Sequence, residues 1–141
     1  MGRHWFISLP LAAAVLGSLG WAGFAPIEVA TREAAFDIPK GTYARRRAGD
    51  MVEILPDTIR LTLGLNDVLL IRNHDDVPQI FGPTIMMPGQ SFRLPFERAA
   101  SYQFVCSAHA SGQLTINVEP EPVTPWARIH WRVRNWSDRS R

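Results

Sequence analysis

Between residues 58 and 118 the apolar side chains come in short runs separated by turn residues, and this pattern constrains the fold more than any other feature. Ile59, Leu61 and Leu63 alternate with polar residues, which is the period of a strand with one buried face. Residues 68–71 form a continuous apolar run, as in a strand buried on both faces. About six or seven such runs, without a long helical pattern, predict a mainly β fold of the sandwich type.

The N-terminal segment, residues 1–27, contains a run without charged side chains from residue 5 onward. At about 1.5 Å per residue, a helix over this run can cross a hydrocarbon core of roughly 30 Å. Trp5 and Trp21 stand where an aromatic belt would place them, and Arg3 is the only charge that precedes the run. The sequence therefore predicts one N-terminal transmembrane helix, a single pass through the bacterial cytoplasmic membrane, with the following domain on the periplasmic side.

Two further observations bear on this anchor. A cleaved signal peptide is the alternative, with Gly20-Trp21-Ala22 as an imperfect cleavage site. Gly17, Gly20 and Gly23 place small residues along part of the helix, which suits packing against another membrane helix or only adds flexibility. The length of the apolar run and the lack of a clean Ala-x-Ala motif favour an uncleaved anchor.

The most informative segment for chemistry is 102–118, which contains Cys106 and, three residues later, His109. A thiolate at the end of one strand and an imidazole on the loop into the next can bind one soft metal ion. By itself this spacing is weak evidence, because a lone cysteine is more often a small buried apolar residue than a ligand. A single cysteine also excludes an intramolecular disulfide.

Several segments around this pair resemble the blue-copper, or cupredoxin, family in their order and spacing. They are Glu53–Gly64, Val68–Gln79, Met87–Gln90 and Tyr102–Val118. The resemblance covers residues 51–119 and implies a Greek-key β-sandwich, with residues 28–50 as a connecting segment before it. In that family copper is held by two histidines and one cysteine in a plane, with a weak axial methionine or glutamine.

The sequence departs from this family at the first histidine ligand. Asn73–Pro78 fits the family pattern Asn-x4-Pro-His, but the ligand position holds Gln79. An amide is a poor copper ligand beside a thiolate. It is instead suited to hydrogen-bond in the region of Cys106 or His109, which would give a metal-free copy of the site. His74 is the alternative ligand, although the loop would have to refold to bring it there.

The other ligand positions match the family in part. Cys106 and His109 fall on the cysteine and the second histidine. Gln113 is the candidate for the weak axial position, because no methionine follows residue 87. The resemblance thus implies a degenerate copper site at Cys106, His109, Gln113 and Gln79. We expect no bound cofactor, with copper as the alternative, since the missing imidazole removes much of the copper affinity.

The C-terminal segment, residues 120–141, is basic, with five arginines and two acidic residues. Thr124-Pro125 is typical of a helix start. A stripe of apolar residues follows at helical spacing: Trp126, Ile129, Val133 and Trp136. The pattern predicts a short amphipathic helix that packs on the sandwich core, lies on the membrane surface or contacts a partner subunit. Nucleic acid is not expected as a partner, because the predicted topology places this tail outside the cytoplasm.

All five tryptophans lie in the two terminal segments, and none lies in the predicted sandwich. We therefore expect a membrane-anchored accessory subunit of a respiratory or photosynthetic electron-transfer complex, where the link to electron transfer rests on family analogy. The alternative is a small electron carrier with an unusual Cys/His/Gln copper site. The sequence shows neither an acid–base pair nor a nucleophile triad, so we do not expect an enzyme. The residues expected to contact the membrane or partner subunits are Trp5, Gly17, Trp21, Trp126, Ile129, Arg132, Val133 and Trp136.

Overall fold

A computed structural model describes the backbone of residues 5–139 and the side chains of residues 12–137. The described residues form two compact units. Val29–Glu121 make the β unit, and the segments before residue 29 and after residue 121 make the helical unit.

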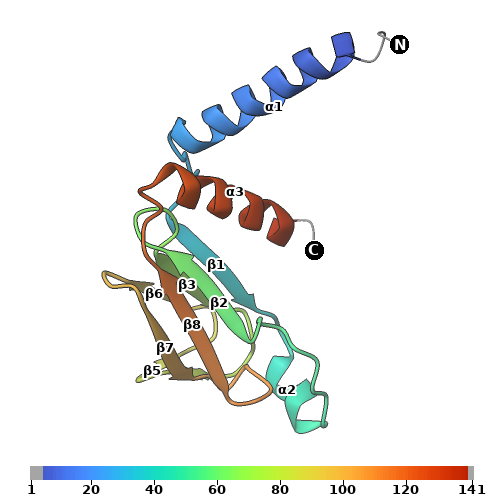
Figure 1. Cartoon of the computed structure of the whole chain (residues 1–141). Helices are drawn as coiled ribbons and strands as arrows, with labels where there is room; N and C mark the ends of the chain where they lie inside the picture. The colour runs from blue at the N-terminus through green and yellow to red at the C-terminus, as the bar shows by residue number, and fades with distance from the viewer. Residues whose placement is uncertain (1–4, 140–141) are drawn as a thin grey trace. The chain divides into compact units, whose positions relative to one another are not determined.

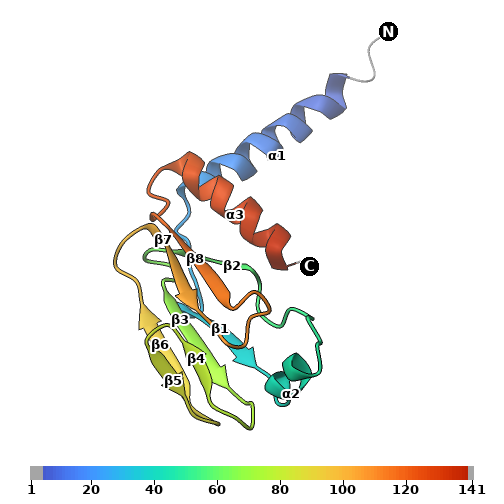
Figure 2. The same ribbon diagram turned by 90° about the horizontal axis from the view of Figure 1, so that it is seen from below.

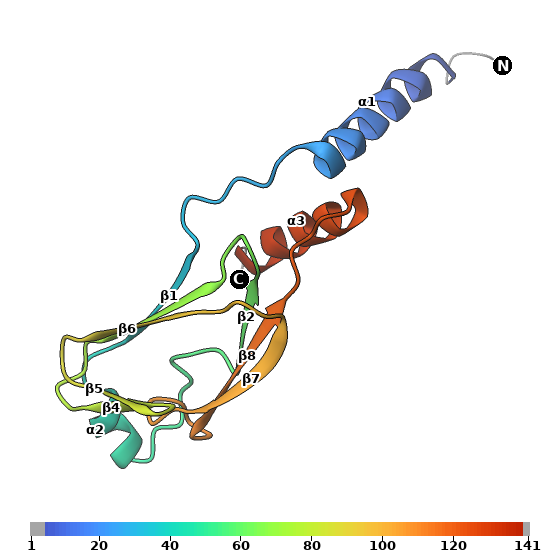
Figure 3. The same ribbon diagram turned by 90° about the vertical axis from the view of Figure 1, so that its left-hand side faces the viewer.

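The β unit is built from short strands in three sheets. The strands are β1 (Glu33–Ile38), β2 (Thr58–Thr62), β3 (Val68–Asn73), β4 (Gln79–Phe81), β5 (Thr84–Met86), β6 (Ser91–Pro95), β7 (Ala100–Val105) and β8 (Gln113–Glu119). Two three-stranded sheets have the orders β1-β3-β6 and β2-β8-β7, and β4 and β5 form a hairpin (Figure 1). The two larger sheets lie in separate layers (Figure 3). The prediction of a mainly β fold is confirmed.

Each three-stranded sheet combines one parallel and one antiparallel pair. In the first, β3 runs parallel to β1 and antiparallel to β6. In the second, β8 runs parallel to β2 and antiparallel to β7. Parallel neighbours cannot be joined by a tight hairpin, so the chain crosses between the two sheets before each parallel pair closes.

The core follows the alternation that the sequence predicts. On β2, Ile59 and Leu61 are buried and the residue between them is exposed. On β8, Leu114 and Ile116 are fully buried in the same way. Burying a side chain of this size stabilises the fold by about 1.5–3 kcal/mol, so these inward rows supply much of the stability of the β unit.

The segment 28–50, expected as a connection, contributes two elements to the β unit. β1 adds a parallel edge strand to β3. α2 (Thr42–Arg47) follows just beyond the end of β1 (Figure 2). Gly41 precedes α2 with a φ of 79°, a conformation that favours glycine.

The helical unit consists of α1 (Trp5–Phe24) and α3 (Pro125–Arg139). The last carbonyl groups of any α-helix lack partners within that helix. Arg128 Nη1 donates to the Phe24 carbonyl oxygen at 3.4 Å. Arg132 Nη2 donates to the carbonyl oxygens of Ala25 and Pro26 at 2.9 and 3.0 Å. The predicted C-terminal helix forms, and its arginines donate hydrogen bonds to carbonyl groups at the end of α1 and just after it.

The prediction of a transmembrane helix in the N-terminal segment is wrong. α1 forms at this place, but no helix in the described part of the chain is both long and apolar enough to cross a membrane. The predicted location, a single pass through the bacterial cytoplasmic membrane with a periplasmic domain, depends on this helix and is therefore also wrong.

We expect Ile116→Ala to lower the free energy of unfolding by about 2–5 kcal/mol, because it opens a cavity around a side chain with 0% exposure. The matched control is Ile85→Ala, which removes the same atoms from a side chain that is 62% exposed and should cost below about 1 kcal/mol. Urea unfolding followed by circular dichroism measures both variants. Equal losses would contradict the assignment of the core.

Candidate functional site

Gln79, at the start of β4, occupies the position of the family's first histidine and is buried. Its Nε2 donates to Asp75 Oδ2 at 2.8 Å. Its Oε1 accepts a hydrogen bond from Ser107 Oγ at 2.6 Å, and this serine directly follows Cys106. Both ends of the amide are therefore engaged, and the amide joins the turn before β4 to the loop after β7.

The Asp75 carboxylate, the other partner of Gln79, is itself buried. Its Oδ1 accepts the backbone N–H groups of Gly41 at 2.8 Å and Asp76 at 2.9 Å. Its Oδ2 accepts the backbone N–H of Tyr43 at 2.8 Å. Burial acts to raise the pKa of the Asp75 carboxyl, but these backbone donors and the Gln79 amide outweigh it and hold that pKa below its usual value. Asp75 therefore carries a charge at neutral pH.

Cys106 is fully buried where the chain leaves β7, and it forms an isolated β-bridge with Phe81. Burial raises the pKa of the Cys106 thiol, while the backbone N–H groups of Ala108 and His109 act in the opposite direction. The thiol is therefore protonated at neutral pH, and it becomes a ligand only if a metal ion displaces its proton.

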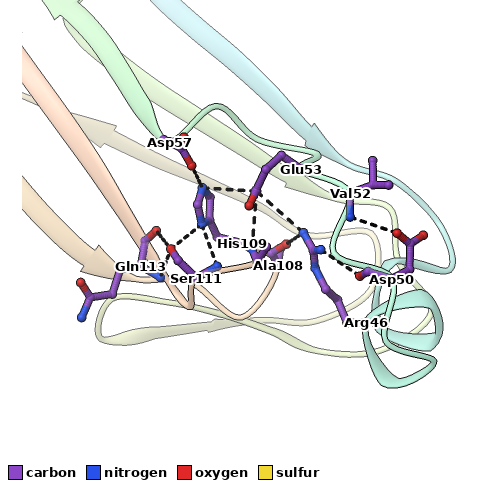
Figure 4. A network of polar contacts seen from close by, with 10 residues as sticks. Arg46, Asp50, Val52, Glu53, Asp57, Ala108, His109, Ser111 and Gln113 are labelled. Carbon is purple, nitrogen blue, oxygen red and sulfur yellow. Dashed lines mark hydrogen bonds and ion pairs between the residues drawn. The ribbon is translucent and has the colours of Figure 1, made fainter.

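The His109 ring lies between a serine and two carboxylates (Figure 4). Its Nδ1 is 2.8 Å from Ser111 Oγ. Its Nε2 is 3.4 Å from Glu53 Oε2 and 3.4 Å from Asp57 Oδ1. Within the described residues, the potential metal ligands grouped with this ring are Glu53 and Asp57, and Cys106 is not among them.

Two further positions considered from the sequence lie at the surface. Gln113, the axial candidate, is exposed, and its side chain extends away from His109 (Figure 4). Its backbone carbonyl accepts a hydrogen bond from Ser111 Oγ at 3.1 Å. His74, the alternative ligand, is exposed, and its Nε2 is 3.2 Å from Asp37 Oδ1.

The structure thus gives the four candidate copper positions different contacts. It brings Gln79 next to Cys106 through the hydroxyl of Ser107. The His109 nitrogens contact Ser111 and the Glu53 and Asp57 carboxylates, and Cys106 does not belong to the group of potential ligands around them. Among the described residues, a plane of one cysteine and two imidazoles is therefore not assembled.

Five polar residues complete the site although the sequence did not single them out: Arg46, Glu53, Asp57, Asp75 and Ser107. Arg46 belongs to a run of three arginines, yet its side chain is only 14% exposed. It donates to the carbonyl oxygens of Asp50 at 3.0 Å and Ala108 at 3.1 Å. The only sequence signal for most of these residues is that they lie in segments with the family resemblance.

The residues of α3 expected to make outside contacts differ in their surroundings. Trp126, Val133 and Trp136 are exposed, by 68%, 62% and 76%. They are the exposed large apolar residues in the described part of α3. The predicted contact at Trp5 concerns a side chain that lies outside the described residues.

Other residues of α3 pack on α1. The Arg132 guanidinium lies 5.3 Å from the centre of the Trp21 ring. A Cβ added at Gly23 would lie 3.1 Å from Pro125 Cβ and 3.6 Å from Ile129 Cδ1, and the first of these contacts is tight, so the missing side chain permits close approach of the two helices. A Cβ added at Gly17 would meet no atom within 4 Å. Of the small residues predicted to aid packing, Gly23 therefore does so within the chain.

No protein-family model matches the chain, and no curated protein matches it. Among solved structures, a purple cupredoxin from Nitrosopumilus maritimus is similar at 22% identity and a TM-score of 0.47, over 61% of this chain and 99% of that one. Two mutant forms of amicyanin, one with Cu(I) and one oxidised, are similar at 17% and 19% identity, each with a TM-score of 0.44 over 65% of this chain and 87% of theirs. All three are cupredoxins, the family that the sequence motifs resemble.

We expect Asp75→Asn to lower the free energy of unfolding by about 2–3 kcal/mol at pH 7, because an amide nitrogen would face backbone donors in a buried place. Since the folded state lowers the pKa of this carboxyl, its contribution is present above the unfolded pKa of about 3.9 and is lost as the pH falls through the lower folded value. The difference between variant and wild type should therefore shrink below about pH 4.

Urea titrations at pH 7 and at about pH 3 measure this difference. The control is Asp76→Asn, because the neighbouring Asp76 side chain is 64% exposed and pairs with Lys40 at the surface. That variant should change stability by below about 0.5 kcal/mol at either pH. A loss for Asp75→Asn that is the same at both pH values would contradict a charged Asp75.

Proposed function

We propose that this protein is an accessory, protein-binding subunit of an electron-transfer complex, in which a cupredoxin-like sandwich serves as the scaffold and the copper position holds a structural amide. The observation that carries the proposal is the buried Gln79 amide, bonded at its two ends to Asp75 and Ser107. A metal ligand must present a lone pair to the ion. The Nε2 of this amide has none, and its Oε1 is engaged by a hydroxyl.

The remaining family ligands support the same proposal. The Cys106 thiol is buried and protonated, since burial raises its pKa. The His109 ring points its two nitrogens at Ser111 and at a pair of carboxylates. A blue-copper centre needs a thiolate and two imidazoles in one plane around the ion, so this arrangement favours a scaffold over a copper carrier.

The link to electron transfer, in a respiratory or photosynthetic complex, rests on the family resemblance of residues 51–119. We infer binding and not catalysis, because the buried thiol that could act as a nucleophile carries its proton and lies away from solvent.

The exposed residues Trp126, Val133 and Trp136 of α3 form the surface that we propose for the partner subunit. At about 100° per residue, Trp126, Val133 and Trp136 fall within about 80° of one another around the helix. Tryptophan residues are among the commonest anchors of protein interfaces, since they bury a large area with few rotatable bonds. The arginines of the same segment make its surroundings basic, which suits a partner with an apolar pocket and an acidic rim.

A small copper-binding electron carrier is the second candidate function. The observation that favours it is the pair of backbone N–H groups, from Ala108 and His109, that act on the Cys106 sulfur and favour its thiolate. Copper would then have to displace the thiol proton and turn the His109 ring.

Addition of Cu(II) to the purified full-length protein separates the two functions. We expect no intense thiolate-to-copper absorption, because the copper position lacks its first imidazole. Gln79→His should raise copper affinity by about tenfold or more, since it restores an imidazole at that position. Titration with Cu(I) and with Cu(II), followed by absorption spectroscopy, measures both proteins.

The control for this experiment is Gln90→His, which adds an imidazole at an exposed residue whose Oε1 accepts the Met87 N–H. It should leave copper affinity unchanged. An intense blue or green band in the wild-type protein would refute the accessory role. An unchanged affinity in Gln79→His would contradict the assignment of position 79.

For the partner surface, we expect the double change Trp126→Ala and Trp136→Ala to release the protein from its complex during native purification. The two side chains are 68% and 76% exposed, so the change removes contact area without opening the core. The control is Tyr43→Ala, which removes an exposed aromatic ring from the β unit. Size-exclusion chromatography of cell extracts compares the three proteins, and full retention of the double variant would exclude this surface.

A further inference from the structure

His109, Glu53 and Asp57 form a group to which the proposed function assigns no ligand. The segment between α2 and β2 supplies both carboxylates, and the loop between β7 and β8 supplies the imidazole, so that the three side chains point toward one another (Figure 4). Their ligand atoms all lie within 4.8 Å of one another. The fold thus brings together two segments about 50 residues apart in the sequence.

The His109 Nε2 is the atom that points to a ligand. The side chain is only 1% exposed, and within the described residues this nitrogen has no hydrogen-bond partner. The oxygens of Glu53 and Asp57 lie 3.4 Å away, beyond the 2.7–3.2 Å typical of an N–H···O hydrogen bond. A buried polar atom without a partner costs free energy, so a ligand bound between these atoms would stabilise the arrangement.

The distances fit a metal ion better than they fit direct hydrogen bonds. With bonds of about 2.0–2.2 Å to nitrogen and oxygen, a tetrahedral ion separates its ligand atoms by about 3.3–3.6 Å. Both Nε2-to-oxygen distances are 3.4 Å. The imidazole is also held in orientation, because Nδ1 contacts Ser111 Oγ at 2.8 Å, a contact of the kind that fixes metal-bound histidines.

The surrounding charges also favour a cation. Arg46 Nη2 lies 3.9 Å from Glu53 Oε2, and the backbone N–H of Ala110 lies 3.5 Å from the same oxygen. Two carboxylates and one guanidinium leave one net negative charge beside the imidazole. The Asp57 side chain is 85% exposed and that of Glu53 39%, so solvent reaches the site and water can complete the coordination.

We propose that His109 Nε2, Glu53 and Asp57 bind one divalent transition-metal ion of the zinc type. One imidazole and two carboxylates are ligands that zinc accepts, whereas magnesium and calcium prefer oxygen ligands alone. The bound ion ties the segment before β2 to the loop that carries Cys106. The site uses neither Gln79 nor Cys106, so it is independent of the accessory role proposed above.

Isothermal titration of chelator-treated full-length protein with Zn²⁺ alone tests the site. We expect one equivalent to bind, and Asp57→Asn to weaken binding by about tenfold or more because it removes a charged ligand. This variant is the decisive one, since a side chain that is 85% exposed can be changed without disturbing the core. Titration with Co²⁺ alone should give the visible absorption of a tetrahedral ion without a thiolate band.

Two control variants complete the test. His74→Gln removes an exposed histidine that faces a single carboxylate, Asp37, and should leave zinc affinity unchanged. Cys106→Ser should also leave it unchanged. Absence of saturable binding, or equal affinity in wild type and Asp57→Asn, would overturn the proposal and leave His109 in simple ion pairs. Loss of binding in Cys106→Ser would overturn it by placing the ion at the family's copper position.

Discussion

The buried carboxylate of Asp75 organises one end of the β unit. A charge that leaves water is costly unless hydrogen bonds replace its hydration, and four donors do so here. Two of these donors are backbone groups at the start of α2, one is the next residue along the turn, and the last is the Gln79 amide. An amide suits this place because it gives a donor to Asp75 and an acceptor to Ser107 at once. The position that holds a metal ligand in the family therefore holds a residue that stabilises the fold of this chain.

The loop after β7 gives the two family ligands that it carries different contacts. The Cys106 N–H donates to the Gly112 carbonyl at 2.9 Å and closes the loop, and the His109 N–H donates to the Cys106 carbonyl at 3.2 Å. Within this tight loop the thiol is directed into the core and the imidazole toward the carboxylates. The thiol side offers a soft ligand that holds its proton, and the imidazole side offers a buried nitrogen with carboxylate oxygens that water reaches. The two sides therefore suit different ions.

How far the sequence predicts this structure depends on whether the signal is local. Alternation within one strand reveals the inward rows of β2 at Ile59 and Leu61, because burial there repeats every second residue. β1 cannot be predicted in this way. The strand is short and most of its residues are small or acidic, and parallel pairing with β3 places them. Gln79 is found from the family spacing, but its partner Ser107 lies 28 residues away and is fixed by the fold. The transmembrane anchor was inferred from the length of an uncharged run, its two tryptophans and Arg3, signals that do not specify what covers the helix.

The same limit applies to the amphipathic stripe of α3. A helical period shows that one face is apolar, but it does not show what that face contacts. In the structure Ile129 and Arg132 face α1, and Trp126 and Trp136 stay open to solvent. Two helices bury too little area to be stable by packing alone, whereas the β unit has its own core. A partner that covers the tryptophans would therefore stabilise the helical unit through binding linkage and leave the unfolding of the β unit unchanged.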